Sequence, residues 1–494
     1  MTAEAATVPR RLRLRPIHVL PALLLAAGIG LRVLVLLGFR QAFLFYGDSY
    51  SYIDSAHQLK PPFVRPLGYS LFIRPLLHFH DLVVISAVQH AMGVAIAVLL
   101  YLVMRRLGLG VVLSSLAMAP VLLDSYQLVL EQYVLAETLL ELLLVLALLA
   151  LAWRPRPTAA ACAAAGGLLA LATLTRTAGI LAIAPVLAYL VLRRVGWRRL
   201  AVTVFAFALP LLGYSAWFDS AYGRFDMSGM TGWFLYGRVG QFADCKGMSL
   251  PATERRLCQT QPPAGRPGPN FYLWAGASPA HHLQRQVVIS TGGYFRGAPM
   301  RLYVNSILED FAQRVLLHQP VAYLDVVAGD LWHYALPGHT HGIRDETPTM
   351  WQFRWQVRPF PTGRVGRQMY RVGGVPRPVQ PEAGWLISYQ RYAYTPGPVF
   401  ALTLLLGLIG AGAGAAVAGA RSVRLEAMLF ALCGFSLPLI AAATSMFDYR
   451  YLLPAIVLLP PGGALGLHAL GVRRRMLLPA PEPTPALAAG DPVS

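Results

Sequence analysis

Acidic and basic side chains lie close together in several connections between the apolar stretches of this 494-residue chain. The sequence FLFYGDSYSYIDSA, residues 43–56, places Asp48 directly after the first long apolar stretch. Charged side chains are costly at the edge of an apolar segment, so their presence there indicates pairing or function. Carboxylates beside several arginines suit a reaction in which a proton is removed and an anionic phosphate is bound or released.

The charged residues of this kind belong to a few connections. They are Asp48, Asp54, Lys60, Arg65 and Arg74 in the first connection, Asp124, Glu131 and Glu137 around the second, and Arg176, Asp448 and Arg450 further along the chain. Asp48 has an alternative role as the cap of a surface helix that begins at Ser49. Arg450 has a possible ion-pair partner in Asp448, and we expect Glu141 to form an ion pair within the helices.

The elements that position these residues are predicted from apolar stretches that match the thickness of a lipid bilayer. Hydrophobic residues make up 56% of the chain and charged residues only 13%, which indicates a multi-pass membrane protein. Ten helices are predicted, at residues 17–38, 82–104, 109–123, 134–153, 158–175, 177–192, 199–217, 396–419, 425–446 and 451–470. The first stretch is too long for a cleaved signal peptide, so we expect it to be retained.

The arginine clusters indicate how these helices are oriented. Ten helices place both termini on one side, together with the N-terminal arginines and the connections at 105–110, 154–157, 193–199, 421–424 and 472–475, which hold seventeen arginines in all. By the positive-inside rule this side is cytoplasmic. The net charge of +19 therefore serves topology, and we expect no nucleic-acid partner. Asp48 and its charged neighbours are then extracytoplasmic, at the surface of the cell membrane.

The chain is predicted to have four parts. These are an N-terminal transmembrane module at 1–217, an extracytoplasmic segment at 218–395, a C-terminal transmembrane module at 396–475 and a disordered cytoplasmic tail at 476–494. Within the second part, residues 301–336 have helical periodicity broken by Pro320, and we expect them to lie along the membrane surface. We also expect Cys245 and Cys258 to form a disulfide in an oxidising exterior, with two free thiols as the alternative.

Two further features of the 218–395 segment could bind ligands. The stretch HYALPGHTHGIRDE, residues 333–346, contains His333, His339, His341, Asp345 and Glu346, a composition that allows a divalent metal but has no zinc-site spacing. A structural or acceptor-contact role is the alternative. The tryptophans of the segment, including Trp351, could stack on sugar rings, and anchoring at the membrane interface is their ordinary role.

The order of several motifs resembles that of the GT-C membrane glycosyltransferases that use polyprenyl-phosphate sugars, a group that includes protein O-mannosyltransferases and the lipid A aminoarabinose transferase. The motifs are LRVLVL (31–36), YGDSYSYIDSA (46–56), KPPFVRPLGYSLFIRPLL (60–77), LVLEQYVLAETLLELLLVLALLAL (128–151), TRTAGILAIAPVL (175–187) and FDYRYLLPAIVLL (447–459). The resemblance covers residues 17–217 and 396–470. It implies the GT-C fold, with about ten transmembrane helices and a large extracytoplasmic segment.

The resemblance also implies roles for individual residues. Asp48 would be the base that deprotonates an acceptor hydroxyl, which attacks the sugar with inversion. Arg65, Arg176 and Arg450, with Lys60 as a further candidate, would stabilise the departing polyprenyl phosphate. Glu131, Glu137 and Asp448 would bind the acceptor or orient an arginine. The sequence departs from the family at Ser49, because relatives have a second acid after the first.

The expected donor is a polyprenyl-monophosphate sugar, with mannose or another hexose as the sugar. The acceptor is a hydroxyl group on a protein, a glycan, a lipid or an exported glycopeptide. Two alternatives remain open at the level of sequence. The first is a membrane transporter or lipid flippase, which shares the basic connections and apolar helices. The second is a ligase that moves a glycan from a diphosphate lipid.

Overall fold

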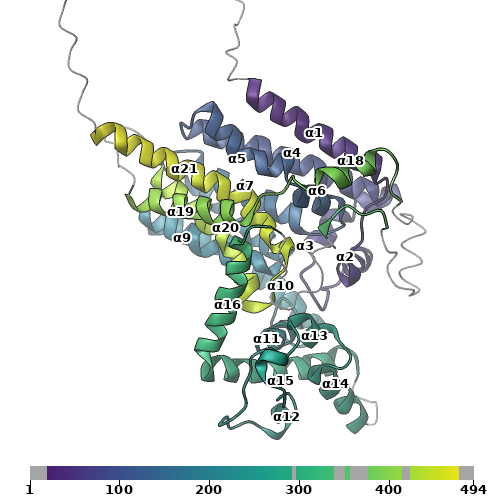
Figure 1. Cartoon of the computed structure of the whole chain (residues 1–494). Coiled ribbons are helices and arrows are strands. Elements are labelled where there is room, and N and C mark those ends of the chain that lie inside the picture. Colours follow the sequence, from purple (N-terminus) through teal and green to yellow (C-terminus); the bar gives the residue numbers. More distant parts are fainter. Residues whose placement is uncertain (1–18, 292–295, 339–350, 357–376, 414–422, 478–494) are drawn as a thin grey trace, which may run out of the picture.

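The structure, a computed structural model, describes residues 19–291, 296–338, 351–356, 377–413 and 423–477. These residues form helices and irregular connections, with two isolated β-bridges and no strand. Figure 1 shows a bundle of apolar helices and, to one side of it, a smaller group that contains α11 to α15. The predicted all-α fold is therefore confirmed for the described part of the chain.

Five of the described helical segments are long and apolar enough to cross a membrane. They are α1 (Val19–Gly38), α4 (Val83–Arg106), α10 (Trp197–Tyr222), α20 (Arg424–Thr444) and the span Tyr449–Gly471, which includes η6 (Tyr449–Leu452) and most of α21 (Leu453–Leu477). A sixth is counted if the bent pair α5 (Val111–Leu123) and α6 (Ser125–Gln132) forms one span. By length and composition these segments make the chain a helical membrane protein.

The remaining apolar helices of the bundle are shorter. They are α7 (Glu137–Ala152), α8 (Ala159–Thr175), η3 (Thr177–Ala182), α9 (Ile183–Leu192) and α19 (Gly397–Ala413). Each of the ten predicted segments therefore contains a helix, although only five or six of the described helices have full spanning length. The helix α10 extends beyond the predicted end at 217 to Tyr222, and α21 continues to Leu477, where the description ends. The predicted tail thus lies almost entirely outside the described residues.

The bend between α5 and α6, which measures 47°, is built around Asp124. The backbone of Asp124 is extended, and its carboxylate accepts a hydrogen bond of 2.8 Å from the N–H of Tyr126, so it caps α6. Arg32 of α1 donates to the carbonyl oxygens of Val121 (2.9 Å) and Leu122 (3.1 Å) at the end of α5. Helix-end carbonyls have no partner within the helix, so Arg32 satisfies groups that the bend leaves open.

The core of the bundle is formed by α4, α5, α7, α8, α9, α20 and α21. The helices α19 and α21 approach closely because Gly410 and Gly466 face each other, and a Cβ atom on Gly410 would overlap the backbone of Gly466. Small residues allow such close helix packing in membrane proteins. This contact holds α19 against the helix that follows the Asp448 loop.

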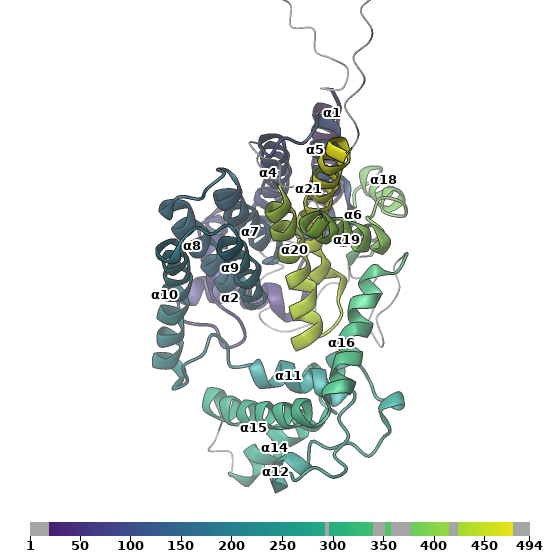
Figure 2. The ribbon, with the colours of Figure 1, turned by 90° about the vertical axis from the view of Figure 1, so that its left-hand side faces the viewer.

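The smaller group of helices has its own apolar core. Its elements are α11 (Thr231–Gly240), α12 (Ala252–Arg255), η4 (Pro263–Gly265), α13 (Pro269–Trp274), α14 (Pro279–Ser290) and α15 (Gly297–His318). The predicted break at Pro320 is confirmed, because α15 ends at His318 and α16 (Pro320–Ala335) begins at Pro320. Figures 1 and 2 show α16 running from this group to the bundle, where it packs on α19 and α20.

Four short elements lie at the edge of the bundle. They are α2 (Tyr46–Gln58), α3 (Gly68–Ile73), η2 (Leu76–Phe79) and α18 (Glu382–Tyr389). The helices α2 and α3 pack on each other, and α18 packs on α1. The apolar side chains of α2, α3 and η2 share a second core with the start of α21 and with α16, so the first connection of the chain and the Asp448 loop are held together.

Candidate active site

Asp48 lies in the first turn of α2. Ser49 accepts a hydrogen bond from the N–H of Phe45 (2.8 Å) and donates one to the carbonyl oxygen of Val134 (2.9 Å), which ties the start of α2 to the segment before α7. The helix begins at Tyr46 and not at Ser49, so the alternative of Asp48 as a helix cap is wrong. The carboxylate of Asp48 is left to interact with other side chains.

Two arginines contact the carboxylate of Asp48. Arg65 places Nη2 at 2.9 Å from Oδ1 and Nη1 at 2.8 Å from Oδ2, which is a paired arrangement of the guanidinium and carboxylate. Arg450 places Nη1 at 2.9 Å from Oδ2. The three side chains are 14%, 17% and 11% exposed respectively, so the cluster is largely withdrawn from solvent. The fold thereby joins the first connection to the loop before α21.

The electrostatics of this cluster favour the ionised form of Asp48. Burial by itself would raise the pKa of the Asp48 carboxyl, but the charges of Arg65 and Arg450, together with the hydrogen bonds from Arg65, outweigh burial. They hold this pKa well below its usual value, and Arg176 adds to the effect from a greater distance. Asp48 is therefore a carboxylate at neutral pH. The arginines that keep it ionised also bind both of its carboxylate oxygens.

Arg176 joins the cluster through a separate set of contacts. It forms an ion pair with Glu137, at the start of α7. Its guanidinium carbon lies 4.8 Å from the centre of the Tyr451 ring, and the guanidinium carbon of Arg450 lies 4.9 Å from the same ring. The hydroxyl of Tyr451 also accepts a hydrogen bond of 3.0 Å from Arg450. Tyr451 thus contacts both Arg176 and Arg450, which the family resemblance predicts to bind the phosphate.

Asp448 is the second carboxylate that contacts Arg450, at 3.3 Å. Its Oδ1 accepts a hydrogen bond of 2.7 Å from the indole N–H of Trp351, and its carbonyl oxygen accepts one of 2.9 Å from the hydroxyl of Tyr334 on α16. Burial raises the pKa of Asp448, against the opposing charge of Arg450. Arg450 therefore contacts both Asp48 and Asp448. The ion pair with Asp448 leaves Arg450 able to contact Asp48 as well.

Lys60 and Glu131 are not brought to Asp48. Lys60 is exposed just beyond the end of α2. Glu131 is buried and pairs with Arg32 (2.7 Å) and with Nδ1 of His90 (2.7 Å) inside the bundle. Its position on α6, after the bend, turns the side chain toward α1 and α4 and away from α2. Glu131 therefore remains a predicted acceptor or positioning residue without a contact to the Asp48 cluster.

Two other acids of the sequence prediction have simple surroundings. Glu141 is buried and accepts a hydrogen bond of 2.9 Å from Gln127, where an ion pair was expected. Asp54 is exposed and accepts a hydrogen bond of 2.7 Å from Gln58 one turn later, so it lies on the solvated face of α2.

Aromatic residues around the arginines were the part of the site that sequence reasoning missed. The guanidinium carbon of Arg65 lies 5.1 Å from the ring centre of Tyr52, and that of Arg450 lies 4.9 Å from the ring centre of Phe45. Cation–π contacts of this kind hold a guanidinium in place without neutralising it. A signal was present for Tyr52, which follows Asp48 by four residues and so lies on the same face of a helix.

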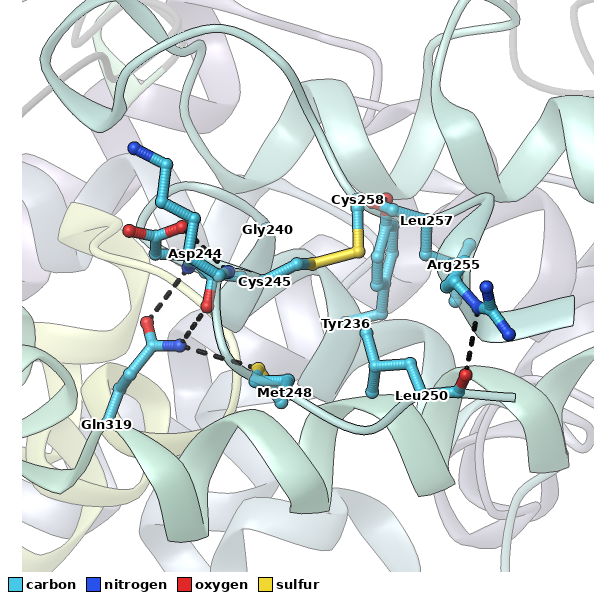
Figure 3. Close-up of a disulfide and its surroundings, with 12 residues drawn as sticks. Tyr236, Gly240, Asp244, Cys245, Met248, Leu250, Arg255, Leu257, Cys258 and Gln319 are labelled. Atoms are coloured by element: carbon cyan, nitrogen blue, oxygen red, sulfur yellow. Dashed lines mark hydrogen bonds between the residues drawn. A yellow bond between two sulfur atoms is a disulfide. The ribbon is translucent and has the colours of Figure 1, made fainter. Parts of the chain in front are cut away.

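The predicted disulfide between Cys245 and Cys258 is present in the smaller group of helices (Figure 3). Next to it, Gln319 accepts a hydrogen bond from the N–H of Asp244 (2.9 Å) and donates one to the carbonyl oxygen of Asp244 (2.5 Å). Because Gln319 stands between α15 and α16, these bonds fix the disulfide loop to the point where the chain turns toward the bundle.

The predicted metal-binding stretch lies mostly outside the described residues. His339, His341, Asp345 and Glu346 belong to the undescribed part, and the ring nitrogen Nδ1 of His333 lies 2.7 Å from the carbonyl oxygen of Gly329. Within the described ranges, no group of three or more His, Cys, Asp or Glu side chains could hold a metal ion. The metal site remains a prediction from the sequence.

Comparison with known proteins gives similarity only to solved structures. No protein-family model and no curated protein matches the chain. The archaeal oligosaccharyltransferase AglB from Archaeoglobus fulgidus, solved in complex with an inhibitory peptide and a dolichol-phosphate, is similar at 13% identity and a TM-score of 0.42, over 97% of this chain and 52% of AglB. ArnT from Cupriavidus metallidurans in the apo state is similar at 14% identity and a TM-score of 0.33, over 92% of this chain and 78% of ArnT.

The chain spans about half the length of AglB. Both solved proteins are GT-C glycosyltransferases, the class that the motifs of this sequence resemble.

Proposed function

We propose that the chain is an inverting membrane glycosyltransferase that moves a sugar, mannose or another hexose, from a polyprenyl-monophosphate lipid to an acceptor hydroxyl. The observation that carries this proposal is the cluster in which Asp48 contacts Arg65 and Arg450, with Arg176 nearby. Such a transfer needs a carboxylate to accept a proton and fixed positive charges to stabilise a phosphate leaving group. The cluster supplies both groups, and Arg450 lies directly before the apolar helix α21.

The chemical step uses these residues as follows. Asp48 accepts the proton of the acceptor hydroxyl, whose oxygen forms a bond to the anomeric carbon of the sugar. The bond from that carbon to the phosphate oxygen breaks, and the electron pair leaves with the polyprenyl phosphate. This product carries one more negative charge than the donor phosphate diester, so guanidinium groups of Arg65, Arg176 and Arg450 favour the transition state over the bound donor.

The contacts of Asp48 also give an order to the reaction. A carboxylate held by two guanidinium groups is a weak base, because the charges that keep its pKa low also oppose protonation. The donor phosphate competes with Asp48 for Arg65 and Arg450. Donor binding would therefore release the carboxylate and raise its basicity before the acceptor hydroxyl is deprotonated.

The proposal includes a location and a set of partners. The site faces the outside of the cell membrane, and both termini are cytoplasmic, in agreement with the distribution of arginines in the connections. The acceptor is a hydroxyl group of a protein, a glycan, a lipid or an exported glycopeptide. Glu137, which pairs with Arg176, would orient that arginine, and Asp448 would orient Arg450.

The direct test is transfer by the purified full-length protein. Radiolabelled polyprenyl-phosphate hexoses are supplied with extracts that contain candidate acceptors, and released polyprenyl phosphate is measured by chromatography. The expected result is release that Asp48→Asn abolishes and Asp54→Asn preserves, since Asp54 lies on the same helix but is exposed. Lack of release with every acceptor would favour a transporter or flippase. Stronger competition by a diphosphate lipid than by a monophosphate lipid would favour a glycan ligase.

A further inference from the structure

A surface cavity of about 570 Å³ lies at the end of the bundle opposite α11 to α15. Residues 155–157, between α7 and α8, and residues 193–199, which lead from α9 into α10, form its walls. Because α10 is about 39 Å long at 1.5 Å per residue, Trp197 in this cavity is far from Tyr222, which leads to the smaller group of helices (Figure 2). The helix α8, about 26 Å long, separates the cavity wall at 155–157 from Arg176, so the cavity is remote from the proposed active site.

The walls of this cavity are strongly basic. Its lining includes no acidic residue, and its arginines are Arg156, Arg193, Arg194, Arg198 and Arg199. Arg193 forms an ion pair with Glu426 of α20. No ion pair joins the other four arginines to a carboxylate within the described ranges, although Arg198 lies 5.7 Å from the ring centre of Trp197. The cavity therefore holds positive charge that the described side chains leave uncompensated.

Arginines elsewhere at the same end of the bundle behave differently. Arg105 donates to the carbonyl oxygen of Leu109 (2.5 Å), and Arg106 donates to that of Trp153 (2.8 Å). Both side chains satisfy the ends of helices, in addition to any effect on topology. Arg156, Arg194, Arg198 and Arg199 have no such carbonyl partner in the described structure, so helix capping does not use their guanidinium groups.

The backbone of Arg194 belongs to the turn that ends α9, where the N–H of Val195 donates to the carbonyl oxygen of Leu190 (3.3 Å). Arg194 has a φ of +52°, a region that L-residues rarely adopt and glycine adopts readily. Gly196, two residues later, has a φ of +88° and shows that the same turn does contain a glycine. Glycine suits this position of the turn, so replacing Arg194 with glycine is expected to remove the guanidinium without strain in the backbone.

An exposed apolar surface continues from the cavity along α10. Phe205, Leu209 and Leu212 are 65%, 54% and 53% exposed. They follow Arg198 by 7, 11 and 14 residues, and at 3.6 residues per turn they lie on the same face of the helix as Arg198. From Arg198 to the end of this stripe at Leu212 the helix rises about 21 Å, which exceeds half of the ~30 Å hydrocarbon core of a bilayer. Trp197, 75% exposed at the cavity mouth, suits the boundary between headgroups and acyl chains.

We propose that this cavity binds the headgroup of an anionic phospholipid, with the phosphate between Arg194 and Arg198 and an acyl chain along the stripe on α10. The shared chemistry is a phosphate ester, which guanidinium groups bind with paired hydrogen bonds. The apolar stripe selects a membrane lipid over a free phosphate, because only a lipid occupies both surfaces. This site is independent of the proposed sugar transfer, since the length of α8 separates it from Arg176.

The test measures lipid binding to the full-length protein by native mass spectrometry in a neutral detergent. Phosphatidylglycerol is titrated against wild type, Arg194→Gln/Arg198→Gln and the control Arg105→Gln/Arg106→Gln, which removes equal charge at the same end of the bundle. The first variant is expected to lose affinity on the order of thirtyfold, at about fivefold per arginine. The control is expected to change little, and phosphatidylcholine is expected to bind weakly to all three proteins.

Two further variants separate binding from folding. Arg194→Gly suits the positive φ, so it is expected to keep or raise the thermal unfolding midpoint while it weakens phosphatidylglycerol binding. Phe205→Ser/Leu209→Ser is expected to weaken binding of the lipid but not of inorganic phosphate.

The proposal is overturned by any of three results. The first is equal affinity in wild type and Arg194→Gln/Arg198→Gln. The second is an equal loss in the control variant, which would reduce the effect to overall charge. The third is that inorganic phosphate or glycerol phosphate displaces the bound lipid at the same concentration as added phosphatidylglycerol does. That result would show that the acyl chain contributes nothing to binding.

Discussion

Replacing Asp48 with asparagine is expected to abolish sugar transfer and, at the same time, to tighten binding of the lipid donor. The carboxylate makes three contacts with guanidinium nitrogens, at 2.9 and 2.8 Å to Arg65 and at 2.9 Å to Arg450. A donor phosphate that binds the same nitrogens must first displace the carboxylate. Asparagine has almost the same shape but no charge, so it competes less strongly.

The size of both effects follows from these contacts. A hydrogen bond to a charged group contributes about 1.5–3 kcal/mol, and asparagine keeps one acceptor oxygen for Arg65. Loss of one charged contact therefore makes donor binding more favourable by about 1.5 kcal/mol, which is close to tenfold in affinity. Loss of the proton acceptor is expected to lower the transfer rate by about 10²–10⁴-fold.

The variant is also expected to be less stable without donor, because the largely buried Arg65 loses its charged partner and Arg450 keeps only Asp448. Donor lipid restores that charge, so it should raise the unfolding midpoint of Asp48→Asn by more than it raises that of wild type.

The assay combines three measurements on the purified protein. Binding of a non-transferable polyprenyl-phosphate analogue gives the donor affinity, released polyprenyl phosphate gives the rate, and thermal unfolding with and without lipid gives the stability. Asp54→Asn is the control for each. Donor affinity that is equal to or weaker than that of wild type would refute the competition between Asp48 and phosphate. A rate close to wild type would remove Asp48 from the chemical step.

The remaining predictions concern the arginines and the disulfide. Arg450→Ala is expected to weaken donor binding by about tenfold or more, and unchanged binding would limit Arg450 to its ion pairs. Arg65→Gln removes the strongest charge that lowers the pKa of Asp48, so the acid limb of the transfer rate should move to higher pH. The stability that the ionised Asp48 contributes is present above its unfolded pKa of about 3.9 and is lost as pH falls, so this variant should also unfold at a higher pH than wild type during acidification. Cys245→Ser/Cys258→Ser opens a loop with a sequence separation of 13 and is expected to lower the free energy of unfolding by about 3 kcal/mol. Limited proteolysis measures that change, and an unchanged cleavage rate would contradict it.

Local sequence was sufficient to predict most of the helices. Apolar length gave the ten helical segments, and Pro320 gave the break between α15 and α16, because proline has no N–H for the helix. The disulfide between Cys245 and Cys258 was predicted because they are the two cysteines of the 218–395 segment. The bend at Asp124 was not predicted, since it depends on Arg32 of another helix to satisfy the carbonyl oxygens that it exposes.

Local sequence also indicated which residue types would meet in the site, because charged side chains collect at the ends of apolar helices. It did not decide which of them contact Asp48. Lys60 is close to Asp48 in sequence and remains exposed, whereas Arg450 is 402 residues away and contacts the carboxylate. Glu131 is an acidic residue that could have joined the site, but its side chain lies inside the bundle and pairs with Arg32.

The sequence by itself therefore determined a helical membrane protein with an acid and several arginines between its helices. Only the tertiary structure decided that Arg65 and Arg450 hold Asp48. The physical reason is that helix length and polarity depend on neighbouring residues. The meeting of two distant side chains depends instead on how α2 and α21 pack and on the direction in which each turn of helix points its side chains.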